Sequence, residues 1–151
     1  MARDTLFASK IFGPLLRSVD AIPVRRGQAD ISSIRAIIEK LKKGKGVCLF
    51  PEATRTTDGR IASLKGGFTL LCRRGNAPLV PVLIDGAFEC WPRDQKIFKP
   101  GSTINVYFGK PIPADEISAI EDDKFAAMLT DRLRCMQTEI RLRNGKEPLN
   151  Y

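Results

Sequence analysis

The chain has 151 residues, 43% of them hydrophobic and 28% charged, and its formal net charge is +8. This length suits one domain with a single core, so we expect a single domain over residues 1–151. No apolar run reaches about 18 residues and no segment resembles a secretory signal, which argues against a membrane-spanning or secreted protein. We therefore expect a protein of the cytoplasm or of the cytoplasmic face of a membrane.

The apolar spacing predicts helices and strands that alternate along the chain. In chain order, we expect a helix at 8–19, a strand at 21–24, a helix at about 31–43, a strand at 47–50, a helix at about 66–74, strands at 79–84 and 103–108, and a long helix near 125–140. Alternating strands and helices are typical of an α/β fold with a mostly parallel sheet flanked by helices.

Three polar clusters follow predicted strands: Arg25-Arg26-Gly27, residues 52–56 and Asp85-Gly86. In open α/β sheets, ligands bind at the carboxyl ends of the strands, so parallel neighbours would bring these clusters to one rim. Arg55, with Arg25 or Arg26, would anchor a phosphorylated ligand. The alternative for residues 52–56 is a solvated loop with one surface ion pair, which stabilises a fold by only ~1 kcal/mol.

Lys65 and Gly66 add a cation and the start of a helix just after the second cluster. Helix N-termini attract anions through unpaired N–H groups, which favours a role in the same site. The alternative is that the glycine allows a turn and close helix packing. The segment matches neither a Walker A loop nor a dinucleotide-binding glycine motif.

The basic charge indicates an anionic partner, such as lipid headgroups, a phosphorylated metabolite or nucleic acid, or else a solubilising surface. Aromatic residues are only 7% and no stacking platform is visible, so we expect no nucleic acid. The chain has no histidine, and its four cysteines show no C-x-x-C spacing, so we expect no metal site.

Two surfaces are candidates for membrane contact. One is the apolar side of residues 11–16, and the other is the basic group Arg132, Arg134, Arg141, Arg143 and Lys146. The favoured interpretation places the first in the core and leaves the arginines in solvent. Phe88 and Trp91 would either line an acyl groove or fill the core.

Four ordered blocks resemble the glycerophospholipid acyltransferase family, which includes the lysophosphatidic acid acyltransferases. Residues 50–56, Phe-Pro-Glu-Ala-Thr-Arg-Thr, are similar to the F-P-E-G-T-R-S block of that family. Residues 21–27 resemble the upstream arginine block, Lys65-Gly66-Gly67 the K-x-G segment, and Val80-Pro81-Val82 with Gly86 the V-P-V block. The resemblance covers roughly residues 5–113.

The resemblance implies transfer of a fatty acyl group from acyl-coenzyme A or acyl-carrier protein to the hydroxyl of a lysoglycerophosphate, with no metal or organic cofactor. It implies that Glu52 positions the acceptor and that Arg26 and Arg55 bind its phosphate. Thr54, Lys65, Gly66, Pro81 and Gly86 complete the implied substrate-binding residues, with the last two on the acyl side.

The chain departs from the family at two places. Ala53 replaces a glycine, which matters only if that position needs a positive φ. The family's N-H-x-x-x-x-D motif, whose histidine is the base, is absent, and residues 5–16 resemble the segment that follows it. We therefore expect an N-terminally shortened, catalytically impaired chain that lacks the first strand and helix. The alternative is a non-catalytic phosphate- or lipid-binding remnant.

Overall fold

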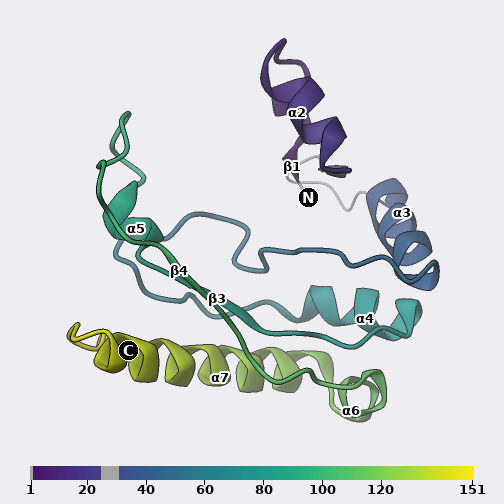
Figure 1. Cartoon of the computed structure of the whole chain (residues 1–151). Coiled ribbons are helices and arrows are strands. Elements are labelled where there is room, and N and C mark those ends of the chain that lie inside the picture. The colour runs from purple at the N-terminus through teal and green to yellow at the C-terminus, as the bar shows by residue number, and fades with distance from the viewer. Residues whose placement is uncertain (1, 25–30) are drawn as a thin grey trace.

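The computed structural model describes residues 2–24 and 31–151. Figure 1 shows short helices and strands in the first part of the chain and one long helix, α7, near its end. In chain order the elements are β1 (Ala2–Arg3), α1 (Asp4–Phe7), α2 (Phe12–Ser18), β2 (Pro23–Val24), α3 (Ile31–Lys42), the 3-10 helix η1 (Gly66–Phe68), α4 (Thr69–Gly75), β3 (Val82–Asp85), α5 (Ala87–Cys90), β4 (Asn105–Phe108), α6 (Ala114–Ala119) and α7 (Asp122–Arg143).

The helix predictions succeed where the sequence also marks the helix ends. α3 ends two residues before Gly44, which has a φ of 71°. α4 stops at Asn76, whose left-handed conformation lets its N–H bond back to the helix. α7 has Asp122 and Asp123 in its first turn and arginines in its last, an arrangement that complements the helix dipole.

The α/β class is confirmed, but the strand pairing differs from the mostly parallel sheet that we expected. β1 and β2 pair in parallel, with Ala2 opposite Pro23. β3 and β4 pair antiparallel, with Val82 opposite Phe108 and Asp85 opposite Asn105. These are the two strand pairs within residues 2–24 and 31–151, and they form two separate sheets.

The strand predicted at residues 47–50 is wrong. This segment has no regular secondary structure, and Phe50 is 65% exposed. A strand requires a neighbour that completes its backbone hydrogen bonds, and no strand pairs with residues 47–50 in the described part of the chain. Val47 and Leu49 do pack, half-buried, against the cluster around Ile37, so the apolar composition indicated partial burial but not strand pairing.

The main core lies where α4, α6 and α7 meet. Phe125 and Ile117 are fully buried there, and the ring of Phe68 packs at a tilt against that of Phe125. Burial also raises the pKa of the Cys72 thiol, which lies in the same cluster. Smaller clusters join α3 to α4 through Ile37 and β3 to α7 through Leu83. The packed part of the molecule is therefore built from α3, η1, α4, β3, α6 and α7.

The predicted helix at residues 8–19 is shorter than expected, and its apolar side is not in the core. Ile11, Phe12 and Leu15 are 79%, 54% and 56% exposed, which overturns the favoured interpretation. The side of α2 that is packed contains Gly13, where an added Cβ would lie 2.6 Å from the Phe7 carbonyl oxygen. Glycine is thus required for the close approach of α1 and α2, while the opposite side of α2 is left open.

Candidate functional site

The loop that follows residues 47–50 contains the first group of predicted site residues. The Glu52 carboxylate accepts a hydrogen bond from the Ala62 N–H at 3.1 Å, which joins the two ends of the loop. Ala53 has a φ of 58°, in the left-handed region that favours glycine. The departure from the family's glycine therefore falls on a position whose backbone does need a positive φ.

Side chains within the loop fix its turn. The Thr56 hydroxyl oxygen accepts a hydrogen bond from the Gly59 N–H at 3.0 Å, and the Asp58 carboxylate accepts one from the Arg60 N–H at 3.0 Å. The Arg60 N–H lowers the pKa of Asp58 below its usual value. Such side-chain bonds to nearby backbone groups stabilise turns, so this segment has a defined shape.

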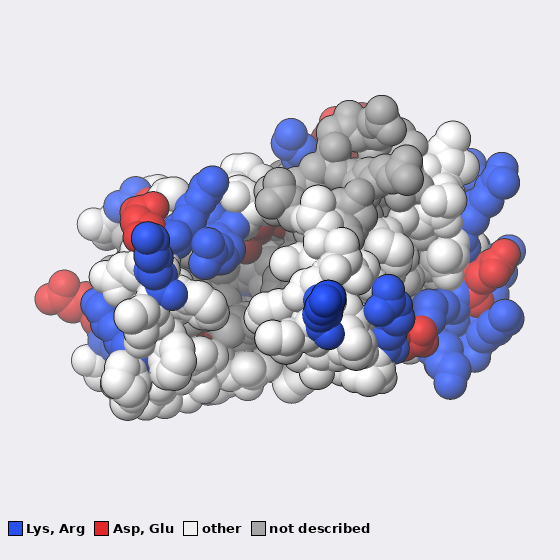
Figure 2. Space-filling view, turned by 90° about the horizontal axis from the view of Figure 1, so that it is seen from above, with Lys and Arg blue, Asp and Glu red and all other residues white. Residues whose placement is uncertain are grey.

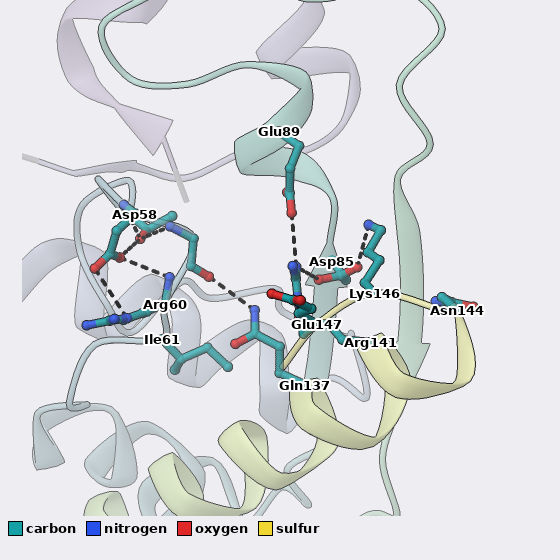
Figure 3. A network of polar contacts seen from close by, with 12 residues as sticks. Asp58, Arg60, Ile61, Asp85, Glu89, Gln137, Arg141, Asn144, Lys146 and Glu147 are labelled. Carbon is teal, nitrogen blue, oxygen red and sulfur yellow. Dashed lines mark hydrogen bonds and ion pairs between the residues drawn. The ribbon is translucent and has the colours of Figure 1, made fainter. Parts of the chain in front are cut away.

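Two residues in the second half of α7 and one residue that follows the helix hold this loop against α7. Gln137 donates to the Gly59 carbonyl at 3.1 Å, and Arg134 donates to the Ile61 carbonyl at 3.1 Å. The Tyr151 hydroxyl accepts a hydrogen bond from the Ile61 N–H at 3.2 Å and also bonds Gln137. Figure 3 shows the Gln137 contact next to the Asp58 turn. We call this group, Arg134, Gln137 and Tyr151, the loop latch.

The guanidinium of Arg134 also lies 4.6 Å from the centre of the Tyr151 ring. A cation over an aromatic face is attracted to it, so this contact helps to hold the latch together. The sequence does not signal the latch, because its members lie more than 70 residues from the loop. No local pattern signals a pairing of that range.

The predicted phosphate anchor Arg55 is exposed on this loop. The Arg55 Nη2 atom lies 3.5 Å from the Arg93 carbonyl oxygen, at the limit of a hydrogen bond. Thr54 is exposed beside it. The other anchor, Arg26, lies with Arg25 and Gly27 outside the described residues. The structure thus presents Arg55 to solvent on a loop with a defined shape.

Lys65 and Gly66 lie at the start of η1, where the chain meets the beginning of α7. Lys65 is exposed, whereas Gly66 is buried, and an added Cβ there would lie 2.9 Å from backbone atoms of Asp122. The Thr69 hydroxyl lies 2.6 Å from an Asp122 carboxylate oxygen, and Arg73 pairs with the same oxygen at 2.9 Å. Gly66 therefore has the packing role that was the alternative interpretation.

The third predicted cluster, Asp85-Gly86, is occupied by contacts within the fold. The Asp85 carboxylate is 1% exposed and pairs with Arg141 at 3.1 Å and with Lys146 at 3.0 Å. Arg141 also pairs with Glu89 at 2.9 Å, as Figure 3 shows. Arg141 and Lys146, which were expected in solvent, thus balance a buried carboxylate.

Pro81 and Gly86 have backbone roles at the two ends of β3. The buried Pro81 offers its carbonyl to the Gly109 N–H at 2.8 Å. Gly86 has a φ of 90°, and an added Cβ would lie 2.2 Å from the Thr103 carbonyl oxygen. No other residue fits this position without a change in the backbone. Gly86 thereby sets the turn from β3 into α5.

Two of the three predicted clusters therefore meet at the same end of α7. Gln137 contacts the loop that holds Glu52 and Arg55, and Arg141, one turn further on, contacts Asp85. Two surface hollows, of about 200 and 330 Å³, lie elsewhere: the first beside Ser63 and Thr130, and the second beside Arg35 and Arg74. Among the described residues, the candidate site is thus an exposed loop.

Within residues 2–24 and 31–151, no group of three or more His, Cys, Asp or Glu side chains is placed to hold a metal ion. In the same residues, no helix combines the length and the apolar character needed to cross a membrane.

Comparison with known proteins places these features in a family. The family model described as Acyltransferase matches residues 1–85. A 1-acyl-sn-glycerol-3-phosphate acyltransferase of Bacillus subtilis is 32% identical over 133 residues, which are 88% of this chain and 63% of that protein. A chloroplastic 1-acyl-sn-glycerol-3-phosphate acyltransferase of Arabidopsis thaliana is 30% identical over 74% of this chain and 32% of its own length.

The fold has a solved counterpart. The crystal structure of the 1-acyl-sn-glycerophosphate acyltransferase PlsC from Thermotoga maritima superposes with a TM-score of 0.79 at 23% identity, over 93% of this chain and 55% of that one. The chain thus spans less than two thirds of the length of each of these relatives. Because the family model matches more than half of its residues, the chain belongs to the acyltransferase family.

Proposed function

We propose that this chain is the acceptor-binding part of an enzyme that transfers a fatty acyl group to 1-acylglycerol 3-phosphate in phospholipid synthesis. The donor is acyl-coenzyme A or acyl-carrier protein. The observation that supports this most directly is the loop that exposes Arg55 to solvent, close in sequence to Glu52. A hydrogen bond from Ala62 to Glu52 joins the ends of this loop, which lies in the segment that matches the family. The names of the Bacillus subtilis and Arabidopsis thaliana relatives are consistent with this acceptor.

The proposed roles follow from the chemistry of each group. Arg55, together with Arg26, binds the acceptor phosphate, since a guanidinium forms two parallel bonds with phosphate oxygens. Glu52 positions the acceptor through its carboxylate, one oxygen of which already bonds Ala62. Thr54 and Lys65 are exposed and supply further polar contacts, whereas Gly66, Pro81 and Gly86 shape the backbone around the site.

Acyl transfer also requires a base. The acceptor oxygen forms a bond to the thioester carbonyl carbon, the carbon–sulfur bond breaks, and the hydroxyl proton must be removed. Without histidine in the 151 residues, carboxylates with a pKa near 4 and lysines near 10 are poorly matched to this task at neutral pH. Loss of a general base reduces the rate by ~10²–10⁴. We therefore expect these residues alone to bind the acceptor but to turn it over very slowly.

The test is a calorimetric titration of the protein with a short-chain, monomeric lysophosphatidic acid. Arg55→Ala should weaken binding by about tenfold or more, since a charge-assisted contact contributes roughly 1.5–3 kcal/mol. Arg60→Ala is the matched control, because Arg60 lies on the same loop but pairs with Asp58 at 3.7 Å. Equal affinity of the wild type and both variants would contradict the proposal.

A thiol-release assay with acyl-coenzyme A separates the enzyme from its alternative, a non-catalytic phosphate- or lipid-binding remnant. Turnover that depends on Arg55 would mean that another residue supplies the base. Arg55-dependent binding without turnover is the expected result for these 151 residues. Restored turnover when a segment with the H-x-x-x-x-D motif is joined ahead of Met1 would support the enzyme, and its failure would support the remnant.

We also propose that the protein meets its amphiphilic substrates at an anionic membrane surface. The net charge of +8 supports this location. Sedimentation with phosphatidylglycerol vesicles, weakened by salt, is the expected result. Equal recovery with neutral phosphatidylcholine vesicles would argue against the electrostatic part of the proposal.

A further inference from the structure

The loop between α5 and β4 exposes apolar and basic side chains together. In Figure 1 it projects beyond α5, on the side of the sheet away from α7. Trp91, Ile97 and Phe98 are 49%, 77% and 56% exposed. Arg93, Lys96 and Lys99 lie among them and are exposed, with Asp94 as the one carboxylate between residues 91 and 99. We call residues 91–99 the basic-aromatic loop.

The basic-aromatic loop has a defined shape. The Lys99 N–H donates to the Cys90 carbonyl at 2.7 Å, which closes the loop at its base. The Trp91 indole N–H donates to the Gln95 carbonyl at 2.8 Å, and the Gln95 N–H donates to the Pro92 carbonyl at 3.1 Å. Ile97 and Phe98 are therefore held outside the packed part of the molecule by backbone bonds at their flanks.

The composition of this surface matches the interface of a bilayer. Tryptophan is favoured at the headgroup level, where its ring is apolar and its N–H is polar, and apolar neighbours reach the acyl boundary. Lysine and arginine close by attract anionic headgroups. Figure 2, seen from above Figure 1, shows several basic side chains at the left of the view, with uncharged atoms and a few acidic groups around them.

We propose that the basic-aromatic loop inserts Trp91, Ile97 and Phe98 into the interfacial region of an anionic membrane, while Arg93, Lys96 and Lys99 contact lipid phosphates. This inference rests on the proposed function of Arg55 as the phosphate anchor. The two regions are adjacent, because the Arg55 Nη2 atom lies 3.5 Å from the Arg93 carbonyl oxygen. The loop thus brings the bilayer next to the residue that binds the acceptor phosphate. An amphiphilic acceptor then reaches the site without leaving the interface.

The exposed side of α2 is the competing surface. It is apolar as well, but its neighbouring cations are Lys10 and Arg17, and Arg17 already donates to the Phe7 carbonyl at 3.4 Å. The basic-aromatic loop has three cations within seven residues and lies beside Arg55. Charge complementarity to anionic lipid therefore favours the loop.

Trp91 is the only tryptophan in the chain, so its fluorescence reports on this loop directly. Phosphatidylglycerol-containing vesicles should shift its emission to shorter wavelength, and lipids brominated on the acyl chain should quench it. Added salt should weaken both effects. Pure phosphatidylcholine vesicles should produce a much smaller change.

Ile97→Ser combined with Phe98→Ser should weaken vesicle binding by about tenfold or more, because two apolar side chains no longer enter the interface. The matched control is Ile11→Ser with Leu15→Ser, which alters two exposed apolar residues of α2 and should change binding by less than about twofold if the loop is the contact. Circular dichroism of both variants verifies that they fold.

Three results would overturn this inference: no vesicle binding by the wild type, unchanged Trp91 emission on bound vesicles, or loss of binding in the α2 variant alone. The calorimetric titration with monomeric acceptor requires no bilayer. Acceptor binding without loop insertion would therefore reject the membrane contact and leave the proposed function standing.

Discussion

α2 and α7 are both amphipathic helices, but their apolar sides have opposite environments. Phe125 of α7 is fully buried, whereas Phe12 of α2 is 54% exposed. α7 packs against η1, α4 and β3, while α2 packs mainly against the short helix α1. Helical spacing thus identifies which side chains share a face, but only the surrounding chain determines whether that face is buried.

The largest expected effect separates these two helices. Phe125→Ala should lower the free energy of unfolding by about 3–5 kcal/mol, because it leaves a cavity between α4, α6 and α7. Phe12→Ala should change it by less than about 1 kcal/mol, since the ring is already largely in water. Urea unfolding followed by circular dichroism measures both. Similar losses in the two variants would mean that the face of α2 is covered in solution.

The next test concerns two adjacent glycines in the packed part. Gly66→Ala should destabilise the fold by about 1–3 kcal/mol, because the new methyl group would press on the backbone of Asp122. Gly67→Ala is the matched control: no atom lies within 4 Å of its added Cβ. Thermal unfolding compares them. If Gly66→Ala retains full stability but loses acceptor affinity, its role in the site outweighs its packing.

Tyr151→Phe tests how firmly the loop is held to α7. The change leaves the Ile61 N–H without its acceptor, which costs about 1–2 kcal/mol of local stability. Trypsin cleavage after Arg55 and Arg60 should accelerate about fivefold to thirtyfold, if local opening limits the cleavage. Tyr107→Phe is the control, because that hydroxyl bonds Asn144. Equal cleavage rates in the two variants would show that the latch does not restrain the loop.

The smallest effect is expected at Ala53. Ala53→Gly should stabilise the loop by about 0.5–1 kcal/mol, since glycine adopts a φ of 58° without steric cost. The same trypsin assay should then show slower cleavage after Arg55. Faster cleavage would mean that the added flexibility of the unfolded loop outweighs the relieved strain.

The sequence predicted best those structural features, such as helix ends, that depend on residues a few positions away. The ends of α3 and α4 follow from residues within a few positions, and the family follows from four short ordered motifs, which the match over residues 1–85 confirms. It failed at residues 47–50, where apolar composition was taken as a buried strand. Burial depends on pairing partners, which composition does not contain.

The candidate site divides in the same way. The exposure of Arg55 and the turn at Asp58 are local properties of the loop. The burial of Asp85 depends on Arg141, 56 positions later, which turns an expected ligand group into a structural ion pair. Local sequence reasoning has no means to assign such a carboxylate to one role or the other.

The loop latch has a consequence for any ligand of the loop that holds Glu52 and Arg55. Because Tyr151 and the loop share hydrogen bonds, each helps to order the other. Free-energy coupling between two sites is reciprocal, so an acceptor that binds more tightly to the ordered loop must also hold Tyr151 more tightly against α7. The segment that follows α7 is therefore a remote reporter of site occupancy: amide hydrogen exchange in residues 146–151 should slow when the phosphate site is filled.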